Sequence, residues 1–325
     1  MPVISYPEEF HAEDLYVDLR STLGTPLLLK CEGFNFAGSI KLKAAVRMVD
    51  GAERAGRLTR DSVLIESSSG NLGVALSMIA ASRGYGFVCV TDARCNLAAR
   101  RLIETFGGQV HMITEPDRDG GLLGARIAYV RRRCEADPNY VWLNQYANPN
   151  NWLAHQASTA PAIARRFPNL DVLFVGAGTT GTLMGCARYF REHAPQVTVV
   201  AVDSEGSVTF GGPARPRMIP GLGTSVRPAL LDESYVDDVV HVAEADAINT
   251  CRRLATRGFV FGGSTGTVIA GATGWLSAHR ADREVTAVAI SPDLGERYLD
   301  SVYQQGWVEE IYGRQAWESD QIAAH

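Results

Sequence analysis

A lysine stands near the start of a predicted helix in the segment Gly38-Ser39-Ile40-Lys41-Leu42-Lys43. We expect Ser39 to cap a helix over residues 40–55. The positive end of the helix dipole disfavours a charged amine in the first turn, which lowers its pKa and gives the free amine that a Schiff base needs. One of two neighbouring lysines can equally well point to solvent, so this motif alone leaves both interpretations open.

Three serines and an asparagine follow the strand predicted over residues 63–66, in Glu66-Ser67-Ser68-Ser69-Gly70-Asn71. A helix is predicted from there over residues 71–83. One serine would suffice to cap this helix, so three hydroxyls exceed what capping requires. A row of hydroxyls and backbone N–H groups at the positive end of a helix suits a carboxylate.

A glycine- and threonine-rich loop, Gly176 to Thr182, lies between a predicted strand (171–175) and a predicted helix (182–193). With Asp203 at the end of the next strand, the loop matches the dinucleotide-binding fingerprint and alone would indicate a nicotinamide or flavin enzyme. The more general prediction is that its backbone N–H groups bind a phosphate. A similar turn, Gly262 to Thr267, occurs later in the chain.

The composition is that of an ordinary globular protein, with 46% hydrophobic and 21% charged residues and a net charge of −5. It excludes wholesale disorder and gives the chain no overall attraction to nucleic acid or anionic lipid. The six cysteines show no CxxC spacing, so we predict neither a metal site nor a disulfide scaffold. Residues 258–278 carry no charge, but glycines interrupt them; we expect a strand, loop and helix rather than a membrane span, and a cytoplasmic protein.

Short apolar segments alternate with helical periodicity, which is the pattern of parallel α/β layers. Further strands are predicted over 87–91, 109–114, 140–144, 197–202 and 285–291, and further helices over 97–106 and 122–134. The Asn- and Pro-rich segment 144–152 marks a domain boundary. We expect a small mobile substrate-binding domain over 45–149, a large cofactor-binding domain over 1–44 and 150–314, and a tail over 315–325.

Together these loops resemble those of the fold-type II pyridoxal-phosphate enzymes, the cysteine synthase and tryptophan synthase β family, over about residues 25–303. The resemblance implies a two-domain α/β fold of parallel twisted sheets flanked by helices, pyridoxal 5′-phosphate as cofactor, and a homodimer. It assigns the Schiff base to Lys41, the cofactor's ring hydroxyl to Asn71 and its pyridine nitrogen to Ser264. The resemblance gives the cofactor phosphate to Gly178, Thr179, Thr180, Gly181 and Thr182, and the substrate carboxylate to Ser68, Ser69, Asn71 and Gln145.

Two positions depart from the family's pattern: Thr180 replaces a glycine of the phosphate loop, and Leu42-Lys43 replaces the common Asp-Arg. At the pyridine nitrogen, Ser264 offers a neutral hydroxyl. Such a group cannot keep the nitrogen protonated as a carboxylate would, so we expect it to favour elimination over transamination.

Residues 115–121, 142–152, 201–211 and 297–303 look most similar to one branch of the family, the synthases that make N-(2-amino-2-carboxyethyl)-L-glutamate for 2,3-diaminopropionate. This resemblance implies β-replacement on O-phospho-L-serine by the amine of L-glutamate. We expect Arg227 to bind the phosphate leaving group, because a guanidinium binds phosphate bidentately. A cysteine synthase, which takes sulfide, and more distantly an NAD-dependent oxidoreductase are the alternatives.

Overall fold

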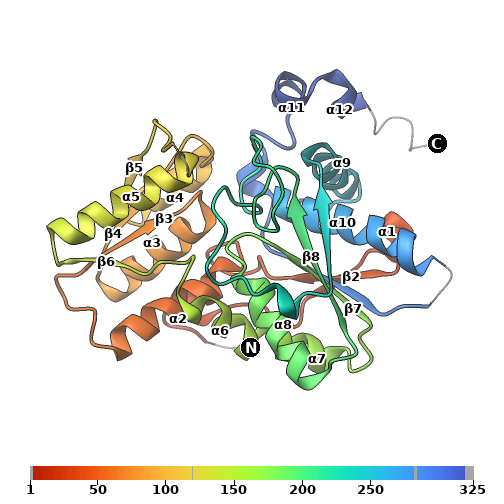
Figure 1. The fold of residues 1–325 in the computed structure, drawn as a ribbon, viewed down its shortest axis with the longest axis horizontal. Helices are drawn as coiled ribbons and strands as arrows, with labels where there is room; N and C mark the ends of the chain where they lie inside the picture. Colours follow the sequence, from red (N-terminus) through yellow and green to blue (C-terminus); the bar gives the residue numbers. More distant parts are fainter. Residues whose placement is uncertain (1–2, 119, 282–283, 319–325) are drawn as a thin grey trace.

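The computed structural model describes residues 3–118, 120–281 and 284–318, which fold around two separate sheets (Figure 1). The smaller sheet has four parallel strands in the order β5-β4-β3-β6. These strands are β3 (Val63–Ser67), β4 (Gly86–Thr91), β5 (Gln109–Met112) and β6 (Tyr140–Trp142). The helices of this half are α2 (Lys41–Arg54), α3 (Asn71–Arg83), α4 (Leu97–Thr105) and α5 (Gly121–Ala136).

Successive side chains of a strand point to opposite faces, and both faces of the smaller sheet are buried. Leu64 packs on one face in a core that includes residues of α2, α3 and α4. Its neighbour Ile65 packs on the other face, against Val130 of α5. Burial on both faces explains why the strands read as continuous apolar segments in the sequence.

The larger sheet has six strands in the order β1-β2-β10-β7-β8-β9, and only β1 runs antiparallel to its neighbour. Its strands are β1 (Tyr16–Asp18), β2 (Leu27–Cys31), β7 (Val172–Gly176), β8 (Thr198–Ser204), β9 (Asp238–Val242) and β10 (Ala287–Ser291). The helices of this half are α1 (Arg20–Leu23), α6 (Pro149–Ala157), α7 (Thr159–Arg166), α8 (Gly181–His193), α9 (Glu244–Ala255), α10 (Gly263–Arg280), α11 (Gln305–Tyr312) and α12 (Arg314–Glu318). Phe174 packs with α10 on one face, and Leu173 packs with α7 and α8 on the other.

The structure confirms the predicted α/β fold of mainly parallel sheets flanked by helices. One local expectation is wrong: Ser39 does not cap the helix that carries Lys41. That helix begins at Lys41, its N-cap residue is Ile40, and the buried Ser39 hydroxyl has no hydrogen-bond partner among the residues that the structure describes. The chain around Ser39 is instead fixed through its backbone, since Ile40 N donates to Pro292 O at 2.7 Å.

The uncharged residues 258–278 form a loop and most of α10, and in the described part of the chain no helix is long and apolar enough to cross a membrane. Of the predicted tail 315–325, the first residues belong to α12 and the remainder lies outside the described residues. The assignment of a mobile small domain and a fixed large domain stays a prediction.

Candidate active site

A pocket lies at the carboxyl ends of β3, β7 and β10 and is lined by loops from both halves of the chain. Figure 1 shows how these halves are arranged. Ligands of open α/β sheets bind at this edge because the strand-to-helix turns converge there. With one exception, every side chain or loop residue predicted for the site lines this pocket. These residues are Lys41, Ser68, Ser69, Asn71, Gln145, Gly178, Thr179, Thr180, Gly181, Thr182 and Ser264.

Lys41 is the first residue of α2 and lines the pocket. Burial lowers the pKa of its amine to about 8, and the negative charge of Asp293 opposes that effect. A lowered pKa was one of the two interpretations left open by the sequence, and its main cause is burial, whereas the sequence argument invoked the helix dipole. A lysine with this pKa has a substantial neutral fraction near neutral pH.

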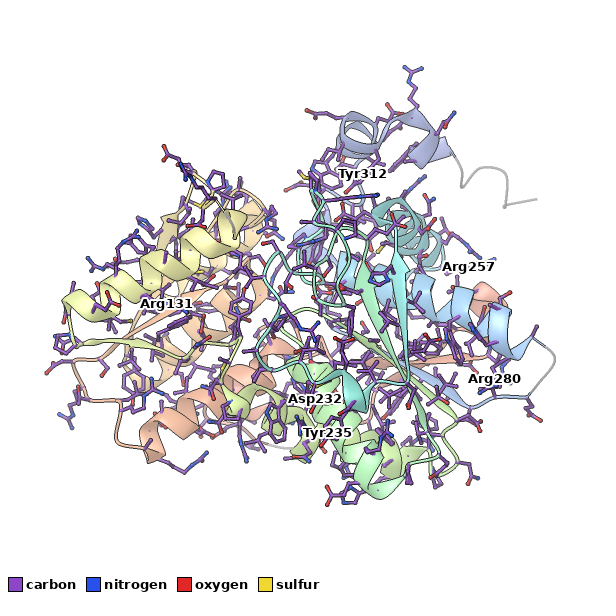
Figure 2. The ribbon with its side chains drawn as sticks, viewed as in Figure 1. Arg131, Asp232, Tyr235, Arg257, Arg280 and Tyr312 are labelled. Atoms are coloured by element: carbon purple, nitrogen blue, oxygen red, sulfur yellow. The ribbon has the colours of Figure 1, made fainter. Side chains whose placement is uncertain are left out.

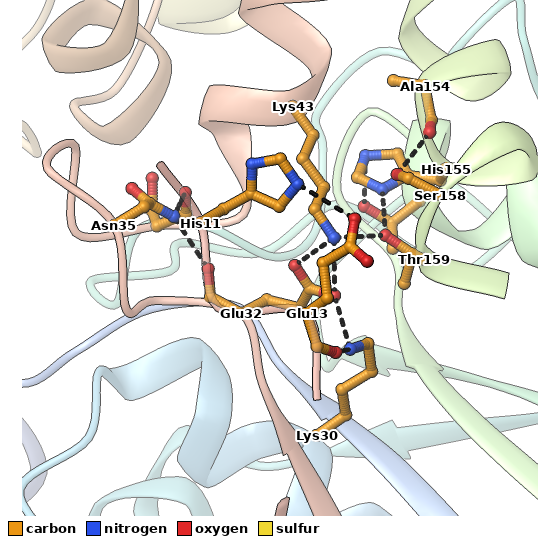
Figure 3. Close-up of polar contacts among 12 residues, drawn as sticks. His11, Glu13, Lys30, Glu32, Asn35, Lys43, Ala154, His155, Ser158 and Thr159 are labelled. Carbon is orange, nitrogen blue, oxygen red and sulfur yellow. Dashed lines mark hydrogen bonds and ion pairs between the residues drawn. The ribbon is translucent and has the colours of Figure 1, made fainter. Parts of the chain in front are cut away.

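Lys43 faces away from the pocket into a buried polar cluster (Figure 3). Its Nζ lies 2.7 Å from Glu32 Oε2 and donates to Thr159 Oγ1 at 3.3 Å. Glu32 also pairs with the buried Lys30, with 3.3 Å between Oε1 and Nζ. Two residues along a helix turn the side chain through about 200°, so only Lys41 of the two lysines reaches the pocket.

The loop Gly178–Thr182 joins β7 to the first turn of α8 and lines the pocket. A Cβ at Gly178 would lie 2.6 Å from Gly221 O, so glycine is required for the two loops to approach. Thr180 has φ 65°, a left-handed conformation rare for a β-branched residue, and its buried Oγ1 has no hydrogen-bond partner within the described part of the chain. Helix α8 begins at Gly181, so unpaired backbone N–H groups of its first turn face the pocket. These groups fit a phosphate.

A chain of hydrogen bonds joins this cradle to the buried cluster of Figure 3. Thr182 Oγ1 lies 3.2 Å from His155 Nε2, and His155 Nδ1 lies 3.1 Å from Thr159 Oγ1, which also accepts from Lys43. Burial lowers the pKa of His155 well below its usual value, and the positive charge of Lys43 adds to the effect. His155 is therefore neutral and orients the Thr182 hydroxyl.

The serines of the loop Ser67–Ser69 have different roles: some hold the loop in place and one is free to bind a ligand. Ser68 Oγ accepts from Gly70 N at 3.1 Å and Gly73 N at 2.9 Å, so this hydroxyl satisfies the start of α3. Gln145 Nε2 donates to Ser67 O at 2.6 Å and holds the loop against the following segment. Ser69 lines the pocket beside the N-terminus of α3 and is the hydroxyl best placed for a carboxylate.

Ser264 and Asn71 meet at a carboxylate that the sequence did not place in the site. Ser264 Oγ donates to Asp293 Oδ1 at 2.8 Å, and Asn71 Nδ2 donates to Asp293 Oδ2 at 2.9 Å. Asp293 lies two residues after the end of β10. That signal was available in the sequence, because an acid after an apolar strand falls at the same edge as the other loops.

Arg227 is the predicted residue that the structure does not bring to the pocket. Its side chain is 51% exposed and pairs with Glu233 at 2.5 Å, in the turn between Asp232 and Tyr235 labelled in Figure 2. Its other guanidinium nitrogen donates to Thr209 O at 3.3 Å. The Arg227 guanidinium, which we expected to bind phosphate, is therefore paired with the carboxylate of Glu233, six residues later in the chain. Asp203, the acid of the dinucleotide fingerprint, is buried at the end of β8 and does not line the pocket either.

Three other arginines line the pocket: Arg94, Arg126 and Arg217. Arg126 is 2% exposed; it lies 3.3 Å from Asp92 Oδ2, but its buried Nε and Nη1 make no hydrogen bond in the described structure. Asp92 is already shared, since it accepts from Arg94 Nε at 3.1 Å and Nη2 at 2.9 Å. Burial lowers the pKa of Arg217, and the charge of Arg94 lowers it further. Arg94 and Arg126 therefore share the single carboxylate of Asp92, and Arg217 adds a third guanidinium to the pocket lining.

Known proteins match this chain over most of its length. Residues 16–293 match the family described as pyridoxal-phosphate dependent enzyme. The N-(2-amino-2-carboxyethyl)-L-glutamate synthases of Ralstonia nicotianae and Cupriavidus metallidurans are 40% and 38% identical, over 88% and 92% of this chain and 85% and 90% of theirs. A crystal structure of O-ureido-L-serine synthase matches with a TM-score of 0.85 and 32% identity, covering 96% of each chain. An O-acetylserine dependent cystathionine beta-synthase from Helicobacter pylori, 24% identical, shares the fold with a TM-score of 0.85 over 94% of this chain and 100% of its own.

Proposed function

Because this chain belongs to the family of pyridoxal-phosphate-dependent enzymes, we propose that it replaces the β-substituent of an activated L-serine with the amine of L-glutamate. The product would be N-(2-amino-2-carboxyethyl)-L-glutamate, the compound in the names of the two relatives. The family match confirms the predicted cofactor and enzyme class, and it removes the NAD-dependent oxidoreductase. The predicted homodimer and cytoplasmic location belong to the proposal.

The pocket residues suit this cofactor. Lys41 would hold it covalently, the loop Gly178–Thr182 would hold its phosphate, and Asn71 and Ser264 would contact its ring. When bound, pyridoxal 5′-phosphate supplies an electron sink for loss and addition of groups at the β-carbon of an amino acid.

The chain's own residues would bind the activated serine and move its proton. Ser69 and the N-terminal N–H groups of α3 hold the substrate carboxylate, and Gln145 and Ser68 keep that loop in place. Lys41 Nζ, once free and neutral, takes the α-proton of the substrate, because a pKa lowered to about 8 makes it an effective base near neutral pH.

The observation that carries the substrate proposal is the buried guanidinium of Arg126, whose Nε and Nη1 make no hydrogen bond among the described residues although Nε lies 3.3 Å from Asp92 Oδ2, in a pocket lined also by Arg94 and Arg217. O-Phospho-L-serine brings a phosphate and glutamate brings two carboxylates, and such anions bind in a partly desolvated cleft only when cations meet them. Sulfide and an acetate ester need no such set of cations. This argument replaces Arg227 with Arg126 as the residue proposed to bind the phosphate.

The test incubates the cofactor-loaded enzyme with O-phospho-L-serine or O-acetyl-L-serine and offers glutamate or sulfide separately. We expect phosphate release coupled to a new amino-acid product only with phosphoserine and glutamate. Arg126→Met should lower kcat/KM for phosphoserine by about 10- to 150-fold, the loss of one charged hydrogen bond of about 1.5–3 kcal/mol. Arg227→Met, whose side chain lies outside the pocket, is the matched control and should change it little. Faster turnover with sulfide would make this protein a cysteine synthase.

A further inference from the structure

Four side chains form a hydrogen-bonded row that leads from Lys43 to the phosphate cradle, and the first three of them are buried. Lys43 Nζ donates to Thr159 Oγ1 at 3.3 Å, and Thr159 Oγ1 lies 3.1 Å from His155 Nδ1 (Figure 3). His155 Nε2 lies 3.2 Å from the Oγ1 of Thr182, which lines the pocket. Hydroxyl groups and imidazole nitrogens can either donate or accept, so the distances alone leave the direction of these bonds open.

The ammonium group of Lys43 fixes the direction of the first bond, because an ammonium can only donate. Thr159 Oγ1 accepts from it, so the single hydroxyl hydrogen of Thr159 needs a different acceptor. Among the described residues, His155 Nδ1 is the remaining hydrogen-bond partner of this hydroxyl. Thr159 is fully buried, and a donor left without an acceptor there would be costly. Thr159 therefore donates to His155 Nδ1.

A neutral imidazole carries one N–H group, so an Nδ1 that accepts leaves the hydrogen on Nε2. His155 is neutral, because burial and the positive charge of Lys43 lower its pKa well below the usual value. Its Nε2–H group donates to Thr182 Oγ1. Within the described part of the chain the Thr182 hydroxyl has no second partner, so its own hydrogen is left for the pocket. In the opposite tautomer Thr182 would donate to Nε2 and present only lone pairs, which repel a phosphate.

We propose that Lys43 is a positioning residue for the cofactor phosphate: through Thr159 it holds His155 in the Nε2–H tautomer, and this tautomer makes Thr182 a hydrogen-bond donor. The neighbouring carboxylate shows why a donor is needed at position 43. Glu32 and Thr159 both lie within 3.3 Å of Lys43 Nζ. Without that donor, the Thr159 hydroxyl would turn to Glu32 and the whole row would reverse. The inference rests on the proposed function only in taking pyridoxal phosphate as the cofactor and Thr182 as a contact of its phosphate.

The first test is nitrogen NMR of the cofactor-free protein with ¹⁵N in its histidine rings, and His155→Gln identifies the His155 signals by deleting them. In the wild type, Nε2 should fall in the range of ring N–H groups and Nδ1 in the range of bare ring nitrogens. The two should exchange ranges in Lys43→Met. Lys43→Arg, which restores a cation that can only donate, should keep the wild-type pattern. An Nδ1–H tautomer in the wild type, or an Nε2–H tautomer in Lys43→Met, would overturn the proposal.

A second test measures whether Lys43 and Thr182, which are linked through Thr159 and His155, act as one unit on cofactor binding. Titration of the cofactor-free proteins with pyridoxal phosphate gives the Kd of Lys43→Met, Thr182→Val and the double variant. Lys43→Met should raise the Kd about 2- to 12-fold, the contribution of one hydrogen bond. Thr182→Val should then cost less in the Lys43→Met background than in the wild type, because the hydroxyl no longer donates.

Fold effects on the Kd that simply multiply would refute a relay from Lys43 to Thr182. The tautomer of the wild type is measured without any substitution at position 43, so the proposal stays testable if Lys43→Met does not fold. Neither test uses a serine substrate or glutamate. Both therefore stand or fail independently of the product assay.

Discussion

Replacing Thr180 with glycine should separate the folding cost of the phosphate cradle from its binding function. Thr180 has φ 65°, and a left-handed conformation costs an L-residue about 1–2 kcal/mol. Glycine relieves this strain but adds about 0.5–1 kcal/mol of chain entropy to be lost on folding. The cofactor-free variant should therefore gain about 0.5–1 kcal/mol of unfolding free energy.

The same substitution should weaken cofactor binding. Thr180 Oγ1 is buried without a partner in the described structure, and a phosphate in the cradle would supply one. Loss of a hydrogen bond to a charged group costs about 1.5–3 kcal/mol, which raises the Kd for pyridoxal phosphate by about 10- to 150-fold.

Two measurements and one control variant check this reasoning. Urea denaturation of the cofactor-free protein gives the stability change, and titration of the cofactor-free protein with pyridoxal phosphate gives the Kd. Thr180→Ser keeps both the hydroxyl and an L-residue, so it should bind the cofactor almost normally and gain no stability. A glycine variant that binds as tightly as the wild type would show that the hydroxyl does not contact the cofactor. One that is less stable would refute the strain argument.

Three further predictions concern the lysines and the serine loop. Lys41→Ala should abolish the visible absorbance of the bound cofactor, and retained absorbance would contradict Lys41 as the lysine that holds the cofactor. Lys43→Ala should retain the absorbance but lose about 3 kcal/mol of unfolding free energy, because the buried Glu32 loses a partner. In the cofactor-free protein, the pKa of Lys41 is about 8 in the folded state and 10.5 in the unfolded state. The unfolded state binds more protons between these values, so the stability of the wild type relative to Lys41→Met should rise from pH 8 to 10.5. Melting temperatures of the two proteins that differ by a constant amount across this range would exclude the lowered pKa. Ser69→Ala should lower kcat/KM for the activated serine about 10- to 150-fold in steady-state assays, and an unchanged value would leave the substrate carboxylate to other groups.

Local sequence patterns predicted most of the strands that are buried on both faces, although the buried strand Leu27–Cys31 was not predicted. Val63–Ser67 and Gly86–Thr91 were predicted to within one residue of their observed ends because apolar β-branched runs have few alternatives. The edge strand Asp238–Val242 was missed, since its exposure on one edge lets polar residues interrupt the pattern. The strand predicted over 140–144 ends at Trp142, because Asn144 adopts φ 56°, which no strand accommodates.

Site residues were predictable where one short motif carries the chemistry. Lys41, Ser69 and the Gly178–Thr182 loop each lie in a turn between strand and helix, so local reasoning placed them at one edge of the fold. Arg126 lies within α5 and reads as an ordinary solvent-facing charge until the fold buries it beside the pocket. Conversely, Arg227 looked free in its loop, because nothing in the sequence indicated that Glu233 would pair with it.

The buried cluster of Lys30, Glu32, Lys43, Thr159 and His155 constrains how this protein can evolve. Each member pairs with another, so a single substitution removes a partner from a buried group. Lys43 stands where the family commonly has arginine, and both side chains carry a positive charge. Substitutions that keep a cation beside Glu32 are therefore the ones that this buried cluster is expected to accept, whereas a neutral residue at position 43 would call for a second change at Glu32.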